Sequence, residues 1–366
     1  MNKEEKIFLS QYICNIEKEY EIDPKVFKYS QYGDIYKGKR RKDGLQVAIK
    51  FIKSRTLSDK MDEQKCFIRE VFILAKLNHP FCLRLVNFSF LPEPKIVTPF
   101  MPNGTLDDLL KSNDPTKFTP TEKMCSIYAL CSTMDLLHQA GIIHRDLKPA
   151  NIFITDDKDI CIADFGSARK VQKNVDLTDN PKVTPLHAAP EAFLGERYTN
   201  MIDVYSFGVI YYQYFNYDPQ LSTGEKPTMA YVLYSKIQEG IRFERLSEMN
   251  DDQWDIYVTC TLANDSLRPA FHELAYKFET NESLWFENIN REKFAQYIAK
   301  CKEINRNCIE KSELYKNVGN NMPQSQISLE NSFVIPPQNP RHHTHMSSFH
   351  SSHKHYDDDD DDDDTT

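Results

Sequence analysis

The sequence lacks the usual features of a secreted or membrane protein. Its nine cysteines are scattered, and no two are spaced as Cys-x-x-Cys, so neither a disulfide framework nor a zinc ribbon is expected. Residues 1–6 are charged and contain no apolar core of a secretory signal. No apolar run approaches the length needed to cross a bilayer. These absences predict reduced thiols, no membrane span and a cytoplasmic location, with the nucleus as the alternative.

Little net charge lies outside the last residues. The formal net charge of −9 includes −8 from the aspartates at 357–364, which leaves −1 for the rest of the chain. We therefore expect no nucleic-acid partner. Six histidines precede the aspartates. These histidines could bind a divalent metal, and the aspartates could attract a basic partner. The favoured interpretation is a solvated low-complexity tail without a specific role.

Composition predicts one large domain with appendages. Hydrophobic residues make up 40% of the 366 residues, enough for a substantial core. We expect an N-terminal extension over residues 1–20, one large folded domain after it and a helical extension over 281–318. Pro, Gln, Asn and Ser dominate residues 319–366, which we expect to be disordered.

Both extensions are expected to dock on the domain through apolar side chains. A partner-docking helix is the alternative for the first extension. The anchors in the first extension are Ile7, Phe8, Tyr12, Ile13 and Ile16, and those in the second are Trp285, Phe286, Phe294, Tyr297 and Ile298.

Residues 144–152, read with Asp164-Phe165-Gly166, form the most informative part of the sequence. Their side chains could hold a nucleoside triphosphate, its metal ion and a hydroxyl group. Asp146 can accept or orient the proton of the incoming hydroxyl, and Lys148 can pair with the γ-phosphate. Asn151 and Asp164 carry oxygen ligands of the kind that Mg²⁺ prefers. A predicted hairpin between them brings these two residues together.

A lysine and a glutamate upstream provide independent support. Residues 46–52 have the alternating pattern of a strand, in which Lys50 shares an apolar face with Ala48. Charges on such a face are rarely left unpaired. Glu70 lies on the apolar stripe of a predicted helix over 67–77 and is the expected partner. A salt bridge of Glu70 within its own helix is the alternative.

These motifs resemble the signature of the eukaryotic protein-kinase superfamily over about residues 21–280. The resemblance implies an α+β, bilobal protein-kinase fold. A small antiparallel β-sheet lobe with one αC helix would span about residues 21–98, and a larger, mainly helical lobe about 102–280. ATP and Mg²⁺ are the implied cofactors.

The resemblance also implies a role for each matched residue. Asp146 is similar to the catalytic base, and Lys148 and Asn151 to the rest of the catalytic loop. Asn151 and Asp164 would hold the metal. The residues implied for nucleotide binding are Lys50, Glu70, Gly33, Ile35, Ala48, Pro99 and Met101, with the last two offering main-chain groups to adenine.

The substrate class follows from two kinds of feature. Lys148-Pro149 and Thr184 are typical of serine/threonine kinases, whereas residues 203–209 and 268–271 resemble tyrosine kinases. The combination is similar to the tyrosine-kinase-like group. It implies transfer to serine or threonine of protein substrates in intracellular signalling.

The loop that covers the phosphates departs from the family pattern. Only Gly33 of its three expected glycines is present, and Lys28 and Ser30 occupy the other two positions. Because glycine lets the backbone approach phosphate closely, we expect weaker or slower nucleotide binding. A pseudokinase scaffold with a weak or inactive site is therefore the alternative function.

The predicted activation segment spans residues 164–191. Thr178 is its best candidate phosphoacceptor, with Arg145 as the cation that would bind the phosphate. The alternative is that Asp176 or Asp179 already supplies the anion. His187 stands where the family usually has an aromatic residue.

Overall fold

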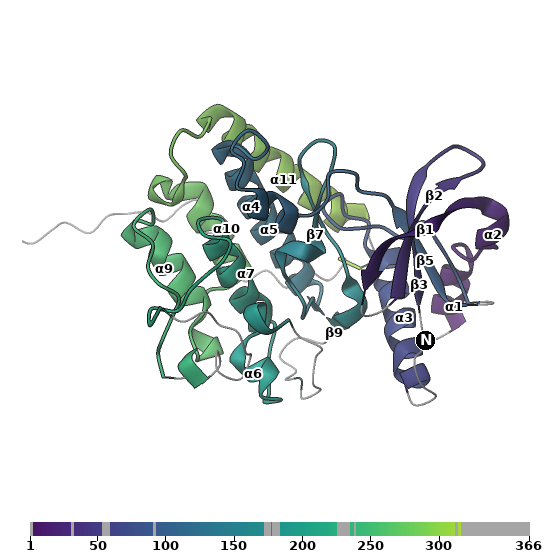
Figure 1. The fold of residues 1–366 in the computed structure, drawn as a ribbon, viewed down its shortest axis with the longest axis horizontal. Coiled ribbons are helices and arrows are strands. Elements are labelled where there is room, and N and C mark those ends of the chain that lie inside the picture. Colours follow the sequence, from purple (N-terminus) through teal and green to yellow (C-terminus); the bar gives the residue numbers. More distant parts are fainter. Residues whose placement is uncertain are drawn as a thin grey trace, which may run out of the picture. The chain divides into compact units, whose positions relative to one another are not determined.

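An antiparallel sheet forms most of the N-terminal lobe (Figure 1). Its strands are β1 (Tyr20–Ser30), β2 (Gly33–Arg40), β3 (Gln46–Ile52), β4 (Asn87–Ser89) and β5 (Lys95–Pro99), in the spatial order β1-β2-β3-β5-β4. The strand predicted over residues 46–52 is confirmed. Val47 and Ile49 are fully buried while Gln46 is exposed, as expected for a half-buried strand.

The computed structural model describes residues 3–30, 33–52, 59–90, 93–171, 177, 184–224, 235–237, 239–311 and 314–315. Several predictions fall outside these ranges. They concern Thr178, Asp176, Asp179 and the tail over 319–366.

One long helix, α3 (Asp59–Lys76), accompanies the sheet (Figure 1). Phe67, Glu70 and Leu74 are buried on the same side of this helix, which confirms the predicted stripe. Burying a carboxylate there requires a partner of opposite charge, and Lys50 of β3 supplies it. Helix α3 therefore positions Glu70, the acidic member of the predicted pair with Lys50.

The N-terminal segment packs on the domain as predicted, but through three of its five expected anchors, Phe8, Tyr12 and Ile16. It forms α1 (Lys3–Ser10) and α2 (Ile16–Glu19), and Ile16 is fully buried in the small-lobe core. Ile7 and Ile13 were expected to cluster with it, but their side chains are 63% and 48% exposed. The helix ends at Ser10, so helical spacing does not relate residue 7 to residues 13 and 16.

The second lobe is mainly helical. Its helices are α4 (Leu106–Ser112), α5 (Pro120–Gln139), α6 (Pro190–Phe193), α7 (Met201–Gln213), α9 (Asp251–Cys260), α10 (Phe271–Thr280) and α11 (Arg291–Lys311). All residues of α7 after Met201 are buried, which identifies it as the central helix of this lobe. The expected α+β arrangement of a small sheet lobe and a larger helical lobe is confirmed.

Local signals set where two of these helices begin. At α5, Thr119 and Glu122 form a capping box, and Pro120 occupies the first helical position. Thr105 and Asp108 form the same box at α4. Both helices therefore start at residues whose side chains satisfy otherwise unpaired backbone N–H groups.

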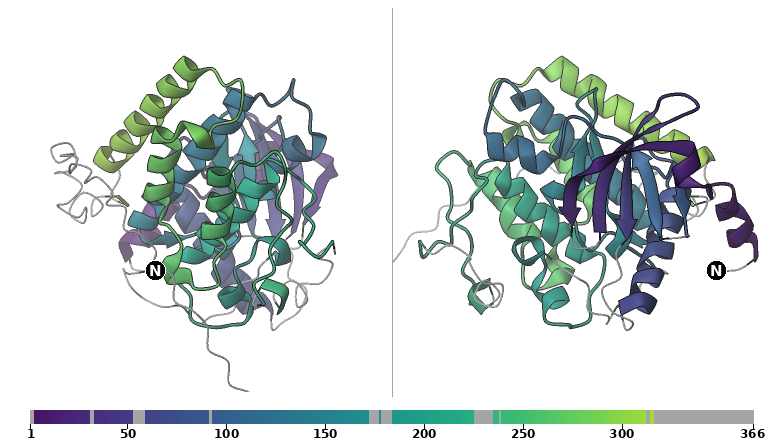
Figure 2. Two further views of the ribbon diagram at one scale, coloured as in Figure 1. Left: turned by 90° about the vertical axis from the view of Figure 1, so that its left-hand side faces the viewer. Right: turned by 45° about the vertical axis from the view of Figure 1, so that its right-hand side comes forward.

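Helices α10 and α11 both pack on α5 (Figures 1 and 2). The ring of Phe294 in α11 is buried and meets Tyr128 of α5 edge-on at 6.2 Å. Ile298 is buried on the same helix. The other three predicted anchors, Trp285, Phe286 and Tyr297, are partly buried against the same core. All five anchors of the helical extension therefore pack on the domain as expected.

Two short strand pairs support the candidate site. β6 (Ile142–Ile143) pairs with β9 (Arg169–Lys170), and β7 (Ile152–Ile154) pairs with β8 (Ile160–Ile162). The second pair is the predicted hairpin.

In the part of the chain that the structure describes, no helix is both long and apolar enough to cross a bilayer.

Candidate active site

Asp203, near the start of α7, holds the backbone of the catalytic loop. Its two carboxylate oxygens accept the N–H groups of His144 and Arg145, each at 2.8 Å, and the ring of His138 lies at 2.9 Å. Burial alone would raise the pKa of Asp203, but the hydrogen bonds and nearby histidines outweigh burial and lower it. The carboxylate is therefore charged and fixes the loop that carries Asp146.

Asp146, Lys148 and Thr184 form a closed group. Lys148 Nζ lies 2.8 Å from Asp146 Oδ2 and 2.6 Å from Thr184 Oγ1. The Thr184 hydroxyl donates to Asp146 Oδ1 at 2.9 Å. Thr184 thus bridges the catalytic loop and the activation segment. The Asp146 carboxylate and the Lys148 ammonium are therefore held next to each other by the Thr184 hydroxyl.

Asn151 and Asp164 provide the oxygen atoms suited to a metal ion. The amide nitrogen of Asn151 donates to the carbonyl and the Oδ2 of Asp146, at 2.8 and 3.0 Å. Because the amide nitrogen makes these bonds, the amide oxygen of Asn151 is the atom that could bind a metal ion. Asp164 adopts a left-handed backbone with φ 60° and follows the end of β8. An amide oxygen and a carboxylate, completed by phosphate oxygens, fit the coordination of Mg²⁺.

No group of three or more His, Cys, Asp or Glu side chains in the described ranges could hold a metal ion by itself. The candidate metal site therefore differs from a cage built only of protein ligands. Mg²⁺ commonly uses one or two protein oxygens together with substrate phosphates, and Asn151 and Asp164 fit that pattern.

Lys50 joins the two lobes at the site. Its ammonium lies 3.0 and 2.9 Å from the two carboxylate oxygens of Glu70, and 3.8 Å from Asp164 Oδ1. Burial raises the pKa of Glu70, and the charge of Asp164 adds to this effect while Lys50 opposes it. The Lys50–Glu70 pair is present as predicted, and the structure adds the contact of Lys50 with Asp164 of the other lobe. The Lys50 ammonium therefore lies beside Asp164, one of the two candidate metal ligands.

The phosphate-covering loop has a glycine, Gly33, at the position where the backbone conformation and the close packing require one. Gly33 has φ 145°, and a Cβ atom there would lie 1.8 Å from the carbonyl oxygen of Phe51. Lys28 and Ser30, which replace the other two glycines, pair with Ile35 and Gly33 in the ladder between β1 and β2. Neither of these positions has a positive φ. Lysine and serine are therefore compatible with the backbone there.

The residues predicted to surround adenine lie at the end of β5 and on the neighbouring strands. Pro99 is opposite Val47, and Ala48 is opposite Thr98. Met101 lies two residues after Pro99, where the chain passes from the sheet lobe toward α4. Ile35 pairs with Lys50 across β2 and β3. The structure therefore assembles this group from three adjacent strands and the connection to the large lobe.

The end of the activation segment is anchored by buried polar pairs. Arg268 binds both carboxylate oxygens of Glu191, at 2.5 and 2.9 Å. His187 is buried and its Nε2 lies 2.8 Å from Gln213 Oε1. Burial lowers the pKa of His187 to about 4, so the ring is neutral at physiological pH. His187 thus fills the position of the expected aromatic residue and binds α7 by a hydrogen bond.

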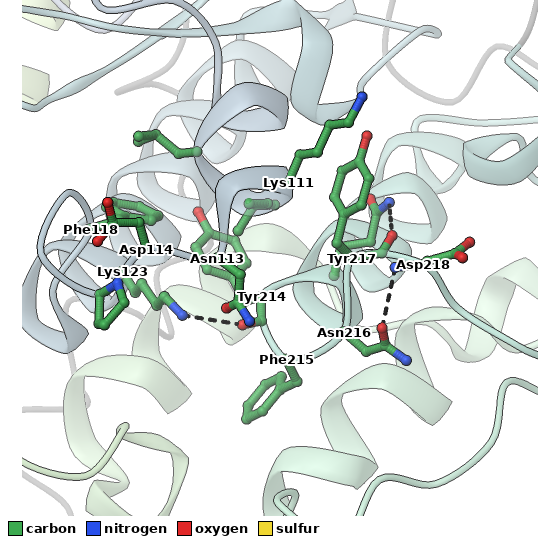
Figure 3. Close-up of a pocket in the computed structure, with 14 residues that line it drawn as sticks. Lys111, Asn113, Asp114, Phe118, Lys123, Tyr214, Phe215, Asn216, Tyr217 and Asp218 are labelled. Atoms are coloured by element: carbon green, nitrogen blue, oxygen red, sulfur yellow. Dashed lines mark hydrogen bonds between the residues drawn. The ribbon is translucent and has the colours of Figure 1, made fainter.

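A pocket of about 240 Å³ lies next to Gln213, the partner of His187, between α4 and the end of α7 (Figure 3). Gln213 lines it, and Tyr217 donates from its hydroxyl to Asp107 of α4 at 3.2 Å. Lys123 reaches the carbonyl of Tyr214 at 3.5 Å. Sequence patterns gave no signal for Gln213, because it lies in a helix that is buried on every side.

Comparison with known proteins agrees with this geometry. The family model described as protein kinase domain matches residues 30–278. Since the match covers more than half of the sequence, the chain belongs to the protein kinase family. The predicted superfamily is therefore confirmed.

Several known kinases are similar to the chain. A serine/threonine-protein kinase of Arabidopsis thaliana is 31% identical over 274 residues, which is 70% of this chain and 44% of that protein. The dual specificity protein kinase shkB of Dictyostelium discoideum is 27% identical over 334 residues, 85% of this chain and 50% of shkB. The tyrosine-protein kinase Abl of Drosophila melanogaster is 28% identical over 254 residues, 68% of this chain and 15% of Abl. The chain spans half or less of each relative.

Proposed function

We propose that this protein transfers the γ-phosphate of Mg–ATP to serine or threonine hydroxyls of protein substrates. The observation that carries the proposal is the closed group of Asp146, Lys148 and Thr184, with contacts of 2.6 to 2.9 Å. Phosphoryl transfer depends on in-line positioning and charge neutralisation rather than on covalent help from the protein. A site for this reaction needs these groups in fixed mutual positions.

Each group has a distinct task in the proposed reaction. Asp146 orients the substrate hydroxyl and accepts its proton, while the Lys148 ammonium balances charge that builds on the transferred phosphoryl group. Lys50, held by Glu70, binds the α- and β-phosphates. Asn151 and Asp164 would hold Mg²⁺, which when bound neutralises phosphate charge as the bond to the leaving oxygen breaks.

The choice of serine and threonine rests on Thr184 and on the relatives. The Thr184 hydroxyl contacts both Asp146 and Lys148, a role that resembles serine/threonine kinases. Several relatives are named serine/threonine-protein kinases. We further propose that the protein acts in cytoplasmic signalling. All nine cysteines, each within the described residues, are free thiols, which is usual for a reducing compartment.

The pseudokinase alternative rests on Lys28 and Ser30 in the phosphate-covering loop. It is the weaker proposal, because the acids and cations of the site keep their mutual contacts and the backbone at residues 28 and 30 does not demand glycine. Lys28 also adds a positive charge to a loop that covers phosphates. We expect weaker nucleotide binding, with transfer preserved.

The proposed activity is tested by transfer from labelled ATP, with Mg²⁺, to a generic basic protein. Asp146→Asn and Asp164→Asn are expected to lower transfer by at least a thousandfold, because they remove the proton acceptor and a metal ligand. Asp159→Asn is the matched control, since Asp159 is a buried carboxylate of the same lobe, paired with Lys300 at 2.6 Å. Its transfer rate should remain within about twofold of the unmodified protein.

Phosphoamino-acid analysis of the labelled product then identifies the hydroxyl. Phosphoserine or phosphothreonine is the expected result, and phosphotyrosine alone would reject the proposed substrate class. If the unmodified protein transferred no phosphate and a thermal-shift titration with ATP also gave no response, the scaffold alternative would replace the enzyme.

A further inference from the structure

Arg145, directly before Asp146, has an uncommon backbone conformation and a buried side chain. Its φ is 68°, a left-handed value that is unfavourable for a residue with a Cβ atom. The Asp203 carboxylate holds its N–H, as described above. The whole residue is only 6% exposed. A buried guanidinium must find hydrogen-bond acceptors, so the positions of its acceptors determine where Arg145 lies.

Two of these acceptors come from distant parts of the sequence. The Arg145 Nε donates to the carbonyl oxygen of Ser167 at 2.6 Å. Its Nη1 donates to the hydroxyl of Tyr198 at 2.5 Å. Ser167 directly follows the metal-binding motif that begins at Asp164. The guanidinium therefore connects the catalytic loop with the metal loop and with Tyr198, which follows α6.

Tyr198 also organises the activation segment through its main chain. Its N–H donates to the carbonyl of Leu177 at 3.1 Å, and its own carbonyl accepts the N–H of Leu177 at 3.0 Å. The Tyr198 side chain is fully buried. One residue thus contacts the activation segment through its backbone and Arg145 through its hydroxyl.

We propose that Tyr198 is a positioning residue for the phosphoryl-transfer step. Its hydroxyl fixes the guanidinium of Arg145, and because Asp146 is the next residue, this contact also fixes the Asp146 carboxylate against Lys148 and Thr184. The inference rests on the proposed function. It makes the alignment of the catalytic aspartate dependent on a neutral hydroxyl that lies 53 residues away in the sequence.

Tyr198→Phe removes the hydroxyl and keeps the buried ring. We expect kcat to fall about tenfold, the size of effect expected from one charge-assisted hydrogen bond. The KM for ATP should stay within about twofold, because the Lys50–Glu70 pair that binds the phosphates is unchanged. A general loosening of the fold would lower the melting temperature and reduce the active fraction, which lowers the apparent kcat at unchanged KM. The kcat is therefore expressed per active molecule, and the melting temperature of each variant is measured beside it.

Tyr211→Phe is the matched control. Tyr211 is likewise a fully buried tyrosine of the large lobe, and its hydroxyl has no hydrogen-bond partner among the described residues. Its kcat should remain within about twofold of that of the unmodified protein. All variants are prepared with a phosphatase and checked by intact mass, so that activation-segment phosphate does not vary between them.

A double-mutant cycle tests whether the hydroxyl acts through Arg145. Arg145→Leu should lower kcat strongly, and adding Tyr198→Phe to it should cause no further loss, because the shared contact is already gone. Fully additive losses would overturn the proposed route. A kcat for Tyr198→Phe equal to that of Tyr211→Phe, in an active protein, would reject the role of Tyr198 alone. Absence of transfer in the unmodified protein would reject the proposed function and this role together.

Discussion

Gly33 is the residue at which backbone geometry most directly limits the candidate nucleotide site. Its φ is 145°, and a Cβ atom added there would lie 1.8 Å from the Phe51 carbonyl oxygen, which excludes any other residue without a shift of β2 or β3. The same strands carry Ile35 and Lys50, which pair across the sheet. A change at Gly33 should therefore alter both stability and nucleotide binding.

Gly33→Ala is expected to lower the free energy of unfolding by about 3 kcal/mol and to raise the KM for ATP several-fold. Gly44→Ala is the control. Gly44 also has a positive φ, of 75°, but a Cβ there would meet only the flexible Lys39 side chain, at 3.2 Å. It should cost about 1 kcal/mol and leave KM unchanged. Urea unfolding measures the free energy of unfolding, and steady-state kinetics measure the KM for ATP. Equal effects of the two variants would show that the close approach to Phe51 does not cause the loss.

Residues of the candidate site differ in how far sequence could predict them. Lys50, Asp146 and Asp164 lie in contiguous motifs. Their residue types and spacing are enough to predict the role of each side chain. Tyr198 and Gln213 lie outside these motifs, and no spacing or periodic pattern marks their contacts with Arg145 and His187. Only the folded chain brings these pairs together.

Among the elements, α11 illustrates how the helical extension is attached to both lobes. The ring of His79, just after α3, lies 2.9 Å from Asn305 Oδ1 in α11, and the Asn305 amide donates to the Ser132 carbonyl of α5 at 3.1 Å. The His79 Nδ1 accepts the N–H of Phe81 at 3.1 Å. This acceptor role requires a neutral ring with its proton on Nε2.

Burial lowers the pKa of His79 to about 4, against an ordinary value of 6.5, and the bond to Asn305 only partly opposes this. Below pH 6.5 the unfolded chain binds a proton at this residue that the folded chain does not. The folded state is therefore destabilised relative to the unfolded state as the pH falls from 6.5 to 4, and above 6.5 this contribution disappears.

We predict that His79→Gln makes the protein less sensitive to acid. Between pH 6.5 and pH 5, the unmodified protein should lose about 2 kcal/mol more unfolding free energy than the variant. Urea unfolding at several pH values measures the difference. His272→Gln serves as the control, because Asp135 raises the pKa of that half-exposed ring and its removal should act in the opposite direction. Parallel pH profiles for His79→Gln and the unmodified protein would show that the prediction is wrong.

The secondary-structure elements were predictable where apolar periodicity and local signals agreed. The strand over 46–52, the helix stripe around Glu70 and the hairpin of β7 and β8 follow this rule. The prediction failed at Ile7 and Ile13, because the helix ends at Ser10 and the chain changes direction before α2. A periodic pattern does not reveal such a break when neither glycine nor proline marks it.

At the scale of the whole molecule, charge is distributed very unevenly. Of the formal net charge of −9, the aspartates at 357–364 account for −8. They are separated in the sequence from the matched kinase region, which ends at residue 278. Whether this charge influences catalysis depends on ionic strength, because the screening length is about 8 Å at 0.15 M salt and about 30 Å at 0.01 M.

We therefore predict that deleting residues 342–366 leaves kcat unchanged. The KM for a basic protein substrate should stay within about twofold at 0.15 M salt, because screening removes most long-range attraction. At 0.01 M salt the deletion should raise that KM, since the loss of eight negative charges weakens the long-range attraction of the protein for a basic substrate. Steady-state kinetics at both salt concentrations, with and without a zinc chelator that spares Mg²⁺, measure these effects. A change in kcat on deletion or on chelation would instead assign a regulatory role to the histidines and aspartates.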